Sequence, residues 1–210
     1  MSSVTTHQPR RILVGTVTEG EHGRAATTVL RDFEDALMAY DRYSARVLDA
    51  PQDLQPPTFL HAGDIRAAAP GPDDARAGAL VVAAWDAEVD RAALDVLVAH
   101  TLPQAPAWGI LLCPERGAQD APCKAAQMAE ALGEHYAGTL ICQNALGVLA
   151  SANAPRMGRK RRRRSEAVDH LVGAVRAGLS VKVAARTFGG QNELSENNII
   201  TDSRPRTHRG

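Results

Sequence analysis

One apolar stretch decides the fold class of this chain: residues 79–85, with the sequence ALVVAAW. It lies between Gly78 and Asp86 and contains no polar residue. An uninterrupted apolar run of this length is typical of a strand that is buried on both faces of a sheet. Such strands occur in largely parallel sheets whose faces are covered by helices, so we expect an α/β fold.

Strand and helix patterns alternate around this stretch. Residues 11–17 (RILVGTV) and 108–113 (WGILLC) predict two further strands, and residues 44–48 predict a short one. Residues 50–76 are rich in proline and lack periodicity, which predicts an irregular connection with room for one short element. Apolar side chains recur at helical spacing in two segments, at Val29, Leu30, Phe33, Leu37 and Met38 and again at Leu94, Leu97 and Val98.

Residues 121–152 have a different composition, rich in alanine and leucine. Their apolar stripe, weakened by Gly133 and Gly138, predicts one long helix or two helices joined near Gly138. A helix of that length would serve as a dimer interface. The alternative is two ordinary helices flanking a strand at residues 138–142.

The composition excludes several classes of protein. A chain of 210 residues allows one medium domain and a small appendix. No apolar run approaches the roughly 20 residues needed to span a bilayer, and the polar N-terminus does not resemble a signal peptide. The three cysteines lack C-x-x-C spacing. We therefore expect a cytoplasmic protein with reduced cysteines, no membrane partner, no metal and no cofactor.

Charge is distributed unevenly along the chain. Residues 151–210 contain 13 Lys/Arg and 5 Asp/Glu, a net charge of +8, whereas residues 1–150 contain 11 and 19, a net charge of −8. Six consecutive cations occupy residues 159–164, and patterns of two short helices follow at residues 167–177 and 181–188. A solvated basic arm before a helix–turn–helix is a common arrangement in proteins that bind double-stranded DNA.

Five segments carry a resemblance to a known family, and they occur in the family's order: residues 14–22 (VGTVTEGEH), 80–88 (LVVAAWDAE), 131–136 (ALGEHY), 156–161 (RMGRKR) and 174–189 (AVRAGLSVKVAARTFG). In this order they resemble the serine recombinases of the resolvase/invertase family. The resemblance implies a resolvase-like α/β domain, a long C-terminal helix, a basic arm and a small helix–turn–helix. It also implies DNA strand exchange by a homodimer or a higher homo-oligomer.

The resemblance divides the chain and assigns roles to residues. The implied segments are a catalytic-type domain at 11–120, a dimerisation helix at 121–155, an arm at 156–164 and a helix–turn–helix at 165–200. The flanking polar residues 1–10 and 201–210 are expected to be disordered. Thr18 falls at the nucleophile position, and Arg91 is the candidate for an arginine near the phosphate. The implied DNA contacts are Arg159, Lys160, Arg161, Arg162, Arg163, Arg164, Ser180, Lys182, Arg186 and Gln191.

The chain departs from the family at the residues that carry the chemistry. The family attacks a phosphodiester with a serine hydroxyl and surrounds the phosphate with arginines. Here Thr18 replaces the serine, and Thr16 stands at a neighbouring arginine position. Two family arginines on the long helix align with Ala137 and Gln143. We therefore expect strand exchange to be impaired in this protein.

A different function class fits the first strand and the helix after it. Residues 16–23 (TVTEGEHG) lie where flavodoxin-like folds hold the phosphate of FMN, and Trp85 is placed to cover a flavin ring. Glu19 and Glu21 would repel that phosphate, and the basic arm would have no role. The alternative function is therefore a flavodoxin-like FMN-binding oxidoreductase.

Overall fold

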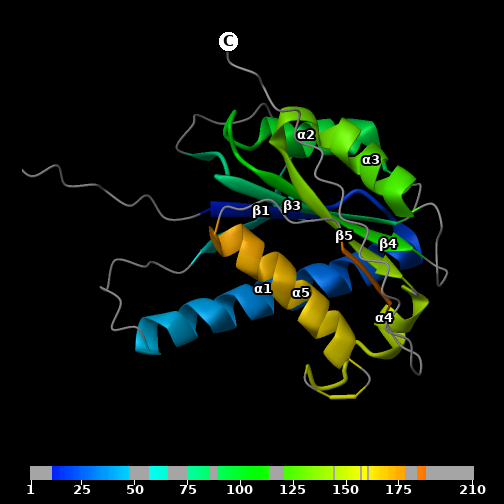
Figure 1. Cartoon of the computed structure of the whole chain (residues 1–210). Helices are drawn as coiled ribbons and strands as arrows, with labels where there is room; N and C mark the ends of the chain where they lie inside the picture. The colour runs from blue at the N-terminus through cyan, green and yellow to red at the C-terminus, as the bar shows by residue number, and fades with distance from the viewer. Residues whose placement is uncertain are drawn as a thin grey trace, which may run out of the picture.

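A computed structural model describes residues 11–47, 57–65, 75–85, 89–113, 121–143, 145–156, 158–159, 161–177 and 184–187. Within these residues six parallel strands form one sheet with the order β2-β1-β3-β4-β5-β6 (Figure 1). Their bounds are β1 Arg11–Thr16, β2 Thr58–His61, β3 Ala79–Trp85, β4 Ala107–Cys113, β5 Tyr136–Gln143 and β6 Ala184–Thr187. The α/β class and the parallel sheet are confirmed.

The helices cover both faces of this sheet. Figure 1 shows α1 (Gly20–Val47) and α5 (Arg162–Ala177) on one face, and α2 (Arg91–Ala99) and α3 (Ala121–Leu132) on the other. The short helix α4 (Leu146–Ala150) packs with α1 and α5. Two 3₁₀ turns complete the described elements, η1 (Ala62–Asp64) and η3 (Gly133–His135). None of the helices in the described ranges is long and apolar enough to cross a membrane.

Each central strand contributes to two separate cores. All residues of β3 and β4 are buried. Successive side chains of a strand point to opposite faces, so Val81, Ala83 and Trp85 pack toward α1 and α5. Leu80 and Val82 pack toward α2 and α3. This burial on both faces explains why residues 79–85 have no polar position.

The prediction of a strand at residues 44–48 is wrong. Ser44 to Val47 continue α1, which is 28 residues long. No helix-breaking residue occurs before Pro51, so the helix continues past the end of its apolar stripe. The second strand is β2, inside the connection at residues 50–76 that had room for one short element.

The prediction of one long helix over residues 121–152 is also wrong. Helix α3 ends at Leu132, where Gly133 adopts φ +54°. The chain then passes through η3 into β5, which is buried over six consecutive positions. The alternative, a strand near residues 138–142 between two helices, is confirmed. The long helix that was expected to form a dimer interface is therefore absent from the described residues.

Only the first helix of the expected helix–turn–helix is confirmed. Residues 167–177 belong to α5, but residues 184–187 form β6, where a helix was expected, and pair with β5. Residues 178–183 and 188–210 lie outside the described residues, as do residues 1–10.

Candidate functional site

The strand order reverses its direction of growth between β1 and β3. From β1 the chain crosses first to β2 on one side and then to β3 on the other side. In open parallel sheets ligands bind outside the carboxyl ends of the strands at such a reversal, and the order 2-1-3-4-5 is the flavodoxin-like one. The candidate site is therefore the edge that contains Val17 to Gly20 after β1 and Trp85 at the end of β3.

A set of hydrogen bonds joins these two strand ends. The backbone N–H of Trp85 donates to the Oγ1 of Thr18 at 2.9 Å. The Oγ1 of Thr16 donates to the carbonyl of Thr18 at 3.3 Å and accepts from its N–H at 3.2 Å. Thr18 is 6% exposed, so its hydroxyl serves as a buried link between β1 and β3.

Two aromatic rings lie against each other at this edge. The imidazole of His22, in the first turn of α1, stacks on the indole of Trp85 with ring centroids 3.9 Å apart and planes 2° from parallel. Trp85 is 5% exposed, whereas His22 is half-buried. The stack therefore places the less buried ring over the more buried one.

Two glycines shape the loop that carries His22. Gly20 adopts φ +65°, and a Cβ at this residue would meet no atom within 4 Å. At Gly23 a Cβ would lie 2.4 Å from the carbonyl oxygen of Thr18. Only glycine allows the first turn of α1 to pack this closely against the loop. Glu19 and Glu21 are exposed beside it, where acids stabilise a helix N-terminus.

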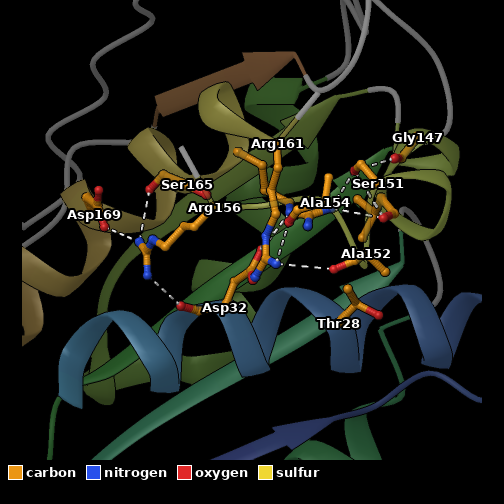
Figure 2. Close-up of polar contacts among 12 residues, drawn as sticks. Thr28, Asp32, Gly147, Ser151, Ala152, Ala154, Arg156, Arg161, Ser165 and Asp169 are labelled. Atoms are coloured by element: carbon orange, nitrogen blue, oxygen red, sulfur yellow. Dashed lines mark hydrogen bonds and ion pairs between the residues drawn. The ribbon is translucent and has the colours of Figure 1, made fainter. Parts of the chain in front are cut away.

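A second polar cluster lies on the buried side of α1, between α1, α4 and α5 (Figure 2). Asp32 of α1 is 1% exposed and pairs with Arg161 and Arg164, both from the basic run. The Nε of Arg164 donates to Asp32 at 2.6 Å, and its Nη1 donates to Ser151 and to the carbonyl of Val148. Burial lowers the pKa of Arg164 to about 10, so it remains charged at neutral pH.

A third arginine extends the cluster toward the middle of α5. Arg156 contacts the carboxylate of Asp169 and donates to the carbonyls of Asp32 and Ser165 (Figure 2). Burial raises the pKa of the Asp169 carboxyl, against the opposing effect of Arg156. The cluster fixes α5 and the segment before it onto α1, which is a structural role.

The two catalytic candidates lie in different settings. Thr18 is at the candidate site, but its hydroxyl is buried and accepts a backbone hydrogen bond. Arg91 is exposed at the start of α2 and pairs with Glu130 of α3 at 2.8 Å. That hydrogen bond to Glu130 raises the pKa of Arg91. No contact in the described residues joins Arg91 to Thr18.

The candidate DNA contacts are divided by the structure. The expectation of a fully solvated arm is wrong for Arg161 and Arg164, which face Asp32 because α5 begins inside the basic run. Exposed positions of the run are Arg159, Arg162 and Arg163, and Arg162 pairs with Glu166. Arg186 lies in β6, and the positions outside the described residues are Lys160, Ser180, Lys182 and Gln191.

Asp32 is the residue that sequence reasoning missed. It lies at the same helical spacing as the buried residues Ala25, Val29 and Ala36 of α1, so its carboxylate points into the core. A buried carboxylate needs a cationic partner. An acid on the apolar stripe of α1 was therefore a signal that a cation from elsewhere in the chain would be buried beside it.

Comparisons with known protein families, with curated proteins and with solved structures find no match to this chain. Among the described residues there is also no group of three or more His, Cys, Asp or Glu side chains that could hold a metal ion.

Proposed function

We propose that this protein binds a small planar heteroaromatic molecule of the flavin type at the carboxyl ends of β1 and β3. The observation that carries the proposal is the aromatic stack of His22 and Trp85 at the reversal of strand order. Ligand sites of doubly wound sheets lie at this position. Flat aromatic side chains there offer a face on which a flat ring can stack.

The residues of the loop fit the ring of such a ligand better than a terminal phosphate. The hydroxyl of Thr18 accepts the N–H of Trp85, and that of Thr16 bonds to the backbone of Thr18, so both are engaged within the protein. Glu19 and Glu21 are exposed at the N-terminus of α1 and oppose an anion. We therefore expect riboflavin to bind at least as tightly as FMN.

A titration of each flavin with the protein tests this function. Stacking on an aromatic ring quenches flavin fluorescence, so we expect saturable quenching. Trp85→Leu should weaken it. Tyr43→Leu is the matched control, because Tyr43 is an exposed aromatic residue near the other end of α1. The proposal fails if no flavin binds, or if the two variants lose affinity equally.

DNA binding is a second proposed function, carried by the exposed part of the basic run. Arg159, Arg162 and Arg163 are exposed near the start of α5, in the segment of the chain with a net charge of +8. Phosphate attraction needs exposed cations and no catalytic centre. The role in recombination, the homo-oligomer and the cytoplasmic location stay predictions. A duplex gel-shift assay at increasing salt tests binding, and salt-independent or absent binding would contradict it.

A further inference from the structure

The ring over Trp85 is the more accessible of the two rings in the stack. His22 is half-buried and belongs to the first turn of α1, whose backbone N–H groups have fewer helical partners than those of later turns. Gly20, two residues earlier, has a positive φ and no atom within 4 Å of the place of a Cβ. Gly23 is confined by the carbonyl of Thr18. The N–H of Gly23 also donates to the carbonyl of Glu19 at 3.0 Å, so the backbone of this turn stays in place when the side chain of His22 rotates.

We propose that His22 is a displaceable cap, which occupies on Trp85 the stacking place of the ligand ring; this inference rests on the proposed function. The imidazole lies 3.9 Å from the indole, centroid to centroid, and 2° from parallel, which is the geometry that a bound planar ring would adopt. One face of an indole holds one ring at a time. The ligand binds to Trp85 after the His22 side chain has rotated away, and the two rings compete.

Competition predicts that truncation of His22 increases the affinity for the ligand. A residue that contacts the ligand loses affinity when it is truncated, whereas removal of a competing ring increases affinity. An aromatic pair contributes about 0.5–1.5 kcal/mol beyond the area that it buries. At about 1.4 kcal/mol for each tenfold change in equilibrium constant, His22→Ala should bind riboflavin about 2- to 10-fold more tightly than the parent protein.

The experiment compares three variants by riboflavin titration on the full chain. His22→Ala should bind more tightly. His22→Phe, which keeps a stacking ring, should bind no more tightly than the parent. His170→Ala is the matched control, because His170 is an exposed histidine on α5, and its affinity should not change. Circular dichroism confirms that each variant is folded.

A second measurement reports the cap without any ligand. The chain has two tryptophans, and Trp108 is 1% exposed. Quenching of tryptophan fluorescence by acrylamide therefore reports access to Trp85, and it should increase in His22→Ala but not in His22→Phe. Unchanged quenching would contradict the cap.

The outcomes separate the two proposals. If the parent binds riboflavin and His22→Ala binds it equally or more weakly, the cap is wrong and the ligand site stands. If neither the parent nor any variant binds a flavin, the ligand site fails and the cap fails with it.

Discussion

At the scale of single residues, Asp32 joins two distant parts of this chain through buried ion pairs. Its carboxylate is the shared partner of Arg161 and Arg164, and both Asp32 and Arg164 are almost fully buried. Two charged groups removed from water are stabilised only when their hydrogen bonds are satisfied. The Ser151 hydroxyl and the Val148 carbonyl supply part of that requirement for Arg164. A run that looks solvated in sequence is thus partly a core contact.

Removal of this carboxylate should destabilise the protein strongly. Asp32→Asn leaves two guanidinium groups without their anion, and breaking a buried ion pair on one side costs about 3–5 kcal/mol. The matched control is Asp35→Asn, because Asp35 is an exposed acid on the same helix. The free energy of unfolding in urea measures both variants. Equal losses for the two would show that the ion pairs with Asp32 are not buried.

A double variant separates two contributions to the free energy of unfolding: the loss of the Asp32–Arg164 ion pair and the burial of an unpaired Arg164 guanidinium. Asp32→Leu with Arg164→Met replaces the buried pair by apolar side chains, a change that is often neutral or stabilising in other proteins. It should recover most of the stability that Asp32→Asn removes. A double variant as unstable as the single one would instead assign the effect to packing or to Arg161.

At the scale of elements, the sequence predicted β3 and β4, which are continuous apolar runs, and failed at β5, where a strand follows directly on the apolar stripe of a helix. Residues 79–85 and 108–113 are continuous apolar runs, and a continuous run of this length has few alternatives to a buried strand. Residues 136–143 are also mostly apolar, but they follow the helical stripe of α3 without an intervening proline. The pattern therefore continued into β5 as if it were one helix. The break lies at Gly133, which adopts a positive φ, whereas in the sequence Gly133 only weakened the apolar stripe.

The candidate site was predictable in part for a related reason. The loop after β1 and Trp85 were located by their places after two strands, which the topology brings to the same edge. The stack of His22 on Trp85 depends on the angle between α1 and the sheet, and no local sequence pattern determines that angle. The partner of Asp32 is 132 residues away in Arg164, so only the packing of α5 on α1 identifies it.

Two glycine substitutions should change stability in opposite directions. A Cβ at Gly109 of β4 would lie 2.6 Å from Cγ of Met128 and 3.0 Å from Oγ1 of Thr139, so in Gly109→Ala the Met128 side chain of α3 must shift. Overpacking of this kind costs about 1–3 kcal/mol. Gly173 of α5 has no atom within 4 Å of its Cβ position, so Gly173→Ala should stabilise the helix by about 0.5–1 kcal/mol.

Urea unfolding of the two alanine variants measures this difference. Each is the control for the other, because the chemical change is the same and only the surroundings differ. Equal effects would mean that α3 does not pack as closely on β4 as the surroundings of Gly109 require.

At the scale of the whole molecule, the opposite charges of the two chain segments meet inside the fold. The segment with a net charge of +8 supplies Arg161 and Arg164, and the segment with a net charge of −8 supplies Asp32. Part of the charge separation seen in sequence is therefore neutralised between α1 and α5. Among the described residues of the basic run, Arg159, Arg162 and Arg163 are the exposed ones, and the DNA-binding proposal can be tested on these three arginines.

Replacement of those three arginines by glutamine gives the sharpest test of DNA binding. The variant is Arg159→Gln, Arg162→Gln and Arg163→Gln, and the control is Arg24→Gln, Arg31→Gln and Arg42→Gln, which removes three exposed cations from α1 instead. Both variants have the same net charge. If the run binds phosphates, only the first variant should bind duplex DNA more weakly, and its salt slope should fall by about 0.9 for each phosphate that the protein no longer neutralises. Equal weakening in both would mean that net charge alone attracts DNA, and the proposed surface at the start of α5 would be wrong.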